Sequence, residues 1–154
     1  MKRTLFAAAL AVAGFVLPAQ ATPTMKELFS TIASTGTTIA VDDPQMCKDP
    51  ELMGRYTYQQ NVVDQLTICI ANHQGDDDEL YDTILHEAVH IAQLCKGGPL
   101  FKPESIYRVA LAREVDTINA RYPRSQAYIE LEARVIARDQ DEVFVTNLIK
   151  EHCK

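Results

Sequence analysis

The stretch Leu85-His86-Glu87-Ala88-Val89-His90 lies within a pattern of apolar residues at helical spacing. Two histidines four positions apart on a helix lie about 40° apart, at about 100° per residue, so both imidazoles point to one side. Such a pair can bind one metal ion, with Glu87 beside it to accept a proton from a metal-bound water. Histidine ligands with an open coordination position are typical of a catalytic zinc site. We therefore predict one Zn²⁺ per chain, bound by His86 and His90; the alternative is two surface histidines on an amphipathic helix.

The helix that carries this motif is expected from about Asp78 to Lys96, where Gly97-Gly98-Pro99 ends it. The acidic run at 76–79 favours the start of a helix, and it lacks the spaced ligands of a calcium loop. Both histidines and Gln93 lie opposite the broad apolar face of this helix. That apolar face consists of Leu80, Ile84, Ala88, Ile91, Ala92 and Cys95. We expect the apolar face to pack against the body of the protein and the histidines to face a cleft.

The rest of the sequence predicts an α+β fold. Strand candidates are residues 37–41, 55–60 and 66–71, and they predict a small antiparallel sheet of about three strands. Helical patterns span residues 24–33, 103–121 and 125–138, and the tail at 141–153 also has apolar residues at helical spacing. We expect a single domain over residues 22–154, which by its H-E-x-x-H motif resembles a minimal zincin-like domain. In it, the sheet packs on the metal-binding helix and two to three further helices.

The first 21 residues have the three parts of a secretory signal peptide. Lys2 and Arg3 are basic, Leu5 to Leu17 is apolar, and Ala19-Gln20-Ala21 is a small-x-small cleavage site. About 13 apolar residues are too few to span a bilayer. We therefore expect export to the periplasm or the extracellular medium, with no membrane association after cleavage.

The net charge is acidic. The whole chain carries −6, and loss of Lys2 and Arg3 would leave 13 basic and 21 acidic residues, a net charge of −8. This balance argues against nucleic acid and against an anionic membrane surface as partners. It does not identify a substrate.

The chain has four cysteines, and an even number in an exported protein indicates two disulfides, with three possible pairings. No C-x-x-C pair occurs, which argues against a zinc–thiolate site. Of the three pairings we select Cys47 with Cys69 and Cys95 with Cys153. At least one bridge is then expected to clamp an element of the cleft.

A zinc ion bound by two histidines needs at least one more protein ligand. Neither His73 nor His152 follows the motif at a suitable spacing, which leaves carboxylates on later helices. Glu132 lies at the centre of an apolar face, where an unpaired carboxylate is costly. Glu130 falls on the far side, where Arg134 can pair with it at i,i+4. We therefore predict Glu132 as the third ligand; the alternative is that it pairs with an arginine from another helix.

These motifs resemble the gluzincin class of zinc metallopeptidases, in which H-E-x-x-H is followed by a ligand glutamate on a later helix. Residues 132–137, Glu-Ala-Arg-Val-Ile-Ala, are similar to an E-A-x-x-x-A segment of several small members. Residues 66–72, Leu-Thr-Ile-Cys-Ile-Ala-Asn, resemble the edge strand and Cys-x-x-Asn stretch of a family of small mitochondrial peptidases, which also have a cysteine at a position comparable to Cys95. The chain departs from the class at Ile136, where gluzincins often place an acidic residue.

The resemblance implies an exported zinc metallopeptidase (a metalloendopeptidase) that acts on a protein or peptide substrate, with Glu87 as general base. An extended peptide is expected to pair with the strand near residues 68–72. Asn72 is the candidate for substrate binding, its alternative role being a turn residue. Tyr128 is the candidate donor to the oxyanion, its alternative role being core packing.

Two other functions stay open. One is a catalytically silent, disulfide-braced binding protein that contains the metal. The other is a metal-buffering or purely structural protein, which the intact Glu87 disfavours.

Overall fold

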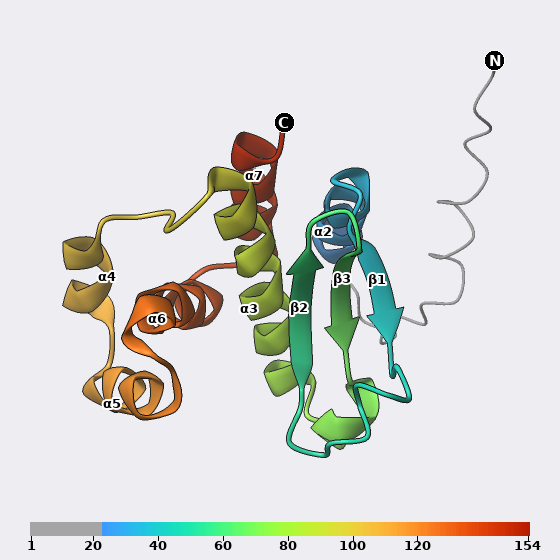
Figure 1. Cartoon of the computed structure of the whole chain (residues 1–154), viewed down its shortest axis with the longest axis horizontal. Helices are drawn as coiled ribbons and strands as arrows, with labels where there is room; N and C mark the ends of the chain where they lie inside the picture. The colour runs from blue at the N-terminus through green and yellow to red at the C-terminus, as the bar shows by residue number, and fades with distance from the viewer. Residues whose placement is uncertain (1–22) are drawn as a thin grey trace.

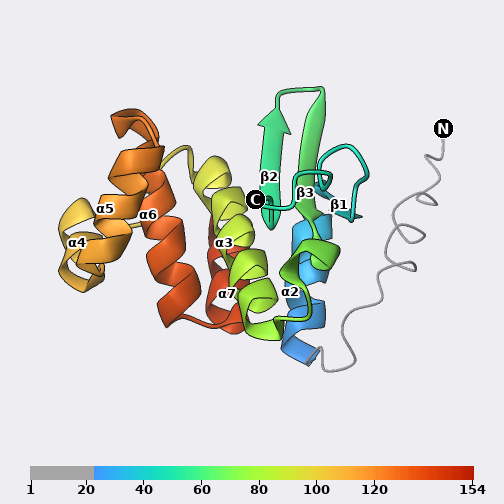
Figure 2. The same cartoon turned by 90° about the horizontal axis from the view of Figure 1, so that it is seen from below.

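The computed structural model describes residues 23–154, and the predicted signal peptide lies outside this range (Figures 1 and 2). The α+β class is confirmed. The described part contains three strands, a short 3-10 helix and six α-helices, more helices than we predicted. The elements are α2 (Pro23–Ser34), β1 (Thr38–Val41), β2 (Gly54–Gln59), β3 (Val63–Ile68), η2 (Ile70–His73), α3 (Asp77–Lys96), α4 (Pro103–Val109), α5 (Ala112–Arg121), α6 (Arg124–Asp139) and α7 (Glu142–His152).

Helix α3 is the central element of the fold. Figures 1 and 2 show it between the sheet on one side and α4, α5 and α6 on the other, with α2 and α7 completing the layer next to the sheet. The Asp76 side chain caps its first turn by accepting a hydrogen bond from Glu79 N, and Gly97 ends it in the left-handed conformation at φ 79°. The predicted apolar face is buried, as Ile84, Ala88 and Ile91 show, each at most 4% exposed. The predicted bounds of this helix are therefore confirmed within one residue.

The sheet has the order β1-β3-β2. Strands β2 and β3 are antiparallel, with Tyr56 opposite Leu66, but β1 runs parallel to β3, with Ile39 opposite Leu66. Three strands are therefore confirmed, but the sheet is mixed and not antiparallel. Strand β3, in the centre, is the most buried of the three, with Leu66 and Ile68 fully buried.

The central position of β3 also corrects the expectation that a peptide pairs with the strand near residues 68–72. A peptide cannot add to β3, since both of its edges are already paired, and residues 70–73 form η2 and not a strand. Within the described residues the edge nearest α3 belongs to β2 (Figure 1).

The helix expected from 103 to 121 is broken into α4 and α5. Ala110 and Leu111 are extended, with ψ near 140°, although no glycine or proline marks the break. Leu111 N donates to Glu114 Oε2 at 2.9 Å, and Arg138 of α6 binds both Glu114 and the carbonyl of Val109. The break lets both short helices pack on α6 around a small second core, made of Ile106, Ile118, Ala127, Leu131 and Val135.

Both disulfides have the selected pairing. Cys47–Cys69 ties the loop after β1 to the end of β3, and Cys95–Cys153 ties the last turn of α3 to the end of α7. Such bridges persist in an oxidising compartment outside the cytosol. Among residues 23–154, no helix has the length and apolarity needed to span a membrane.

Gly54 lets β2 approach α3 closely. A Cβ atom there would lie 2.7 Å from Thr83 Cγ2 and 3.3 Å from Glu87 Cγ. We expect Gly54→Ala to lower the free energy of unfolding by about 1–3 kcal/mol, because overpacking forces side chains and backbone to shift. In a Thr83→Ser background the clashing methyl is absent, so the same substitution should cost less. Urea unfolding of the wild type, the two single variants and the double variant measures the loss caused by Gly54→Ala in each background. Equal losses in the two backgrounds would contradict this packing.

Candidate metal centre

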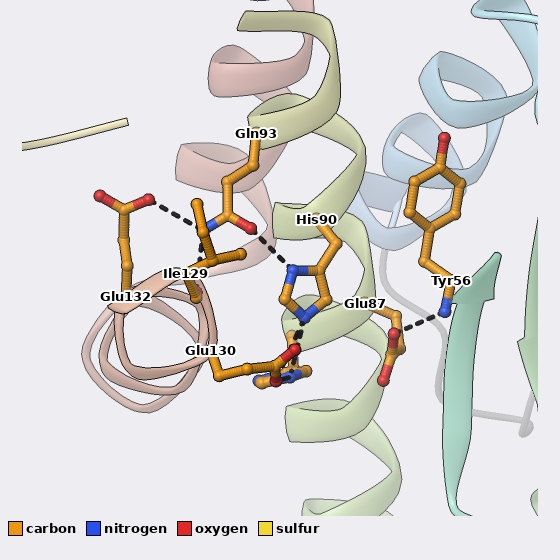
Figure 3. A network of polar contacts seen from close by, with 8 residues as sticks. Tyr56, Glu87, His90, Gln93, Ile129, Glu130 and Glu132 are labelled. Carbon is orange, nitrogen blue, oxygen red and sulfur yellow. Dashed lines mark hydrogen bonds and ion pairs between the residues drawn. The ribbon is translucent and has the colours of Figure 1, made fainter. Parts of the chain in front are cut away.

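Two helices bring three potential ligands together. His86 and His90 lie one turn apart on α3, and Glu130 faces them from α6 (Figure 3). The two Nε2 atoms are 3.2 Å apart. Glu130 Oε2 lies 3.5 Å from Nε2 of His86 and 3.6 Å from Nε2 of His90. No other group of three such side chains in residues 23–154 has the spacing of a metal site.

These separations match a tetrahedral zinc site. Zinc binds imidazole nitrogen at about 2.0–2.1 Å, which places two ligand atoms of a tetrahedron about 3.3–3.4 Å apart. The three observed separations, 3.2, 3.5 and 3.6 Å, lie close to this value. The donor set of two imidazoles and one carboxylate is that of a catalytic zinc site, in which the fourth position stays open.

The electrostatics of the cluster also favour a cation. Burial alone would raise the pKa of Glu130, but hydrogen bonds and charges from His86 and His90 outweigh it and hold this pKa well below its usual range. Burial alone would lower the pKa of His90, but Glu130 and Glu87 raise it overall. The side chains of the three ligands are only 15–18% exposed. The cluster therefore stabilises positive charge between its ligand atoms, with limited access to solvent.

Glu132, the predicted third ligand, is not part of this cluster, and Glu130 lies beside the two histidines instead. Two residues along a helix correspond to about 200°, and Glu132 points to the other side of α6 (Figure 3). Its fully buried carboxylate accepts hydrogen bonds from Gln93 Nε2 at 2.8 Å, Leu100 N at 2.8 Å and Phe101 N at 2.7 Å. The helical pattern correctly indicated a buried carboxylate, but its partners are amides.

Tyr128 lies with Glu132 and not with the histidines. Its hydroxyl donates to the Phe101 carbonyl at 3.1 Å, and its ring packs beside Tyr107. Burial, followed by the charge of Glu132, raises its pKa. It is therefore not placed to act as an oxyanion donor, and the alternative of a packing role fits its contacts.

Asn72 also has a local role. Its Nδ2 donates to the Asp49 carbonyl at 2.9 Å and the Leu52 carbonyl at 2.8 Å. These bonds hold the loop that Cys47–Cys69 closes, as expected for the alternative role of a turn residue.

Glu87 lies on the side of α3 that faces β2 (Figure 3). Its Oε2 accepts a hydrogen bond from Tyr56 N at 2.7 Å. Its charge also contributes to the raised pKa of His90, which places it near the cluster. Glu87 therefore lies between the ligand cluster and the edge of the sheet.

Two residues near the cluster were not predicted. Gln93 Oε1 lies 2.7 Å from His90 Nδ1, and the helical pattern already put this residue on the histidine face. Burial, followed by the charges of Glu130 and Glu87 and a hydrogen bond with Glu130, raises the pKa of Tyr122. Tyr122 ends α5, and no local pattern in the sequence connects it to a motif 32 residues earlier.

The geometry thus defines a small, disulfide-braced α+β domain with a His–His–Glu cluster between two helices. Residues 15–154 match the family described as domain of unknown function DUF8637, and the chain belongs to that family. Comparisons with curated proteins and with solved structures give no match.

The two glutamates of α6 should differ in their effect on stability. Glu132→Ala leaves three amide donors unpaired at about 1 kcal/mol or more each, so we expect a loss of about 3 kcal/mol in the free energy of unfolding. Glu130→Ala leaves no buried backbone amide without a partner and should cost less, about 1–2 kcal/mol in metal-free protein. Guanidinium unfolding in the presence of a chelator measures both losses. A larger loss for Glu130→Ala would contradict the assignment of Glu132 to a structural role.

Proposed function

We propose that this domain is a zinc-dependent peptidase in which His86, His90 and Glu130 bind the metal and Glu87 is the general base. The observation that carries the proposal is the triangle of ligand atoms with separations of 3.2, 3.5 and 3.6 Å. When bound, zinc lowers the pKa of water to about 7 and polarises a carbonyl.

Glu87 is held where a general base is needed. Glu87 directly follows His86 in the chain, and the hydrogen bond from Tyr56 N fixes one oxygen of the Glu87 carboxylate. The second oxygen can accept a proton from the attacking water and later pass it to the leaving amine. Tyr122, near Glu130 and Glu87, takes the place of Tyr128 as the proposed hydrogen-bond donor to the oxyanion.

The edge of β2 supports a peptide substrate. In an antiparallel pair, alternate residues direct their N–H and C=O groups toward the partner strand. The Met53 carbonyl accepts a hydrogen bond from Cys69 N, and Tyr56 N instead reaches Glu87, so the backbone groups of Tyr56 and Tyr58 point away from β3. With the Tyr56 N–H taken by Glu87, the Tyr56 carbonyl and the N–H and C=O groups of Tyr58 remain for an extended peptide to add by strand addition.

The location of the protein follows from the same features. The two disulfides and the predicted signal peptide support a site of action in the periplasm or the extracellular medium.

The catalytically silent binding protein has one observation in its favour. The hydrogen bond from Tyr56 N gives Glu87 a structural use, because it ties β2 to α3. In that case the domain would bind zinc and a protein partner without hydrolysis.

Zinc binding should depend on Glu130. We expect the purified mature protein to take up one zinc ion per chain in a chelator competition titration. Glu130→Ala should weaken binding by more than about 100-fold, the upper range for residues that only support the ligands. Glu151→Ala, at an exposed position on α7, is the matched control and should bind as the wild type does. Unchanged zinc affinity in Glu130→Ala would exclude this ligand set.

Glu87→Gln separates the peptidase from the silent binding protein. The variant should bind zinc as the wild type does, and the cleavage rate of a set of quenched fluorescent peptides should fall by about 10²–10⁴-fold, the usual contribution of a general base. Undiminished turnover in the zinc-loaded variant would refute the role of Glu87. A zinc-loaded wild type that cleaves no peptide would instead favour the binding protein.

A further inference from the structure

Gln93 connects the ligand cluster to the interior of the α3–α6 contact. It is 3% exposed and lies three residues after His90 on α3. Its Oε1 is 2.7 Å from His90 Nδ1, and its Nε2 donates to the Ile129 carbonyl at 3.0 Å and to Glu132 Oε2 at 2.8 Å (Figure 3).

These contacts fix the orientation of the Gln93 amide. A carbonyl and a carboxylate can only accept hydrogen bonds, so the group facing Ile129 and Glu132 must be the NH₂. The amide oxygen then faces His90, and because it can only accept, His90 Nδ1 must carry a proton. In the neutral imidazole this leaves Nε2 unprotonated, with its lone pair toward His86 and Glu130.

Glu132 is itself anchored by the backbone. Two of its three hydrogen bonds come from Leu100 N and Phe101 N, in the segment between α3 and α4. A chain of hydrogen bonds therefore runs from this segment through Glu132 and Gln93 to His90. His86 has no counterpart, since its Nδ1 is buried without a hydrogen-bond partner in the described structure.

We propose that Gln93, oriented by Glu132, is a positioning residue that sets the tautomer of His90 for metal binding. Its effect on zinc affinity rests on the proposed metal centre, whereas the tautomer is a property of the metal-free protein. Hydrogen bonds to the second ring nitrogen of a metal-binding histidine fix its tautomer and ring orientation, and their loss costs about 10–100-fold in metal affinity.

The test combines NMR of His90 with zinc titration in the mature protein. Two-bond ¹H–¹⁵N spectra of the metal-free wild type, at a pH where His90 is neutral, should show the proton on Nδ1. Gln93→Leu should lose this preference and bind zinc about 10–100-fold more weakly. Gln65→Leu is the matched control, since Gln65 Nε2 bonds only to Thr67 Oγ1 in the sheet, and it should leave both readouts unchanged.

A second variant guards against simple misfolding of Gln93→Leu. Gln93→Met keeps the length of the side chain but has no amide, so it should fold as the wild type does and show the same loss of the tautomer preference and of zinc affinity.

Two results would overturn the proposal: a proton on Nε2 of neutral His90 in the wild type, or wild-type zinc affinity in folded Gln93→Leu. A wild type with the Nδ1 proton that binds no zinc would support the tautomer assignment and refute the metal centre, so the two failures are distinguishable.

Discussion

The hydrogen bonds that Gln93 of α3 donates to Glu132 and to the Ile129 carbonyl of α6 fix how these two helices meet, and the candidate site depends on that contact. A fully buried carboxylate is costly unless its hydrogen bonds are made, so few alignments of the helices are tolerated. Glu130 lies two residues earlier on α6 and therefore comes to face His86 and His90. Glu132, a structural glutamate, thus positions Glu130, the glutamate that we propose as a metal ligand.

On its other side, α3 is held by contacts with β2 and by a disulfide to α7. The close approach at Gly54 and the hydrogen bond from Tyr56 N to Glu87 hold the edge strand β2 against the helix. Cys95–Cys153 ties the last turn of α3 to α7, so the helix is held against three neighbours. The residues of the cluster and the edge of β2 are therefore held rigidly relative to one another, as precise chemistry requires.

The sequence predicts the local features of this fold well. It predicts poorly which residues from distant segments contact one another. The bounds of α3, its buried face and the number of disulfides follow from periodicity, capping residues and cysteine count, whereas the count leaves three pairings open and the pairing that we selected is the one observed. The third ligand could not be predicted, because a helical pattern shows that Glu132 is buried but not whether metal or amide N–H groups compensate its charge. The parallel pairing of β1 depends on the path of the connection, which strand patterns do not encode. The break at Ala110 and Leu111 depends on Arg138, which lies on another helix.

The most direct measurement is a crystal structure of the zinc-soaked mature protein with data collected on both sides of the zinc absorption edge. We predict one anomalous peak about 2.0–2.1 Å from Nε2 of His86 and of His90, with a carboxylate oxygen of Glu130 as the third protein ligand. Glu132 should keep its hydrogen bonds to Gln93 and to the Leu100 and Phe101 amides. A peak coordinated by Glu132, or no peak between the histidines at saturating zinc, would contradict the account.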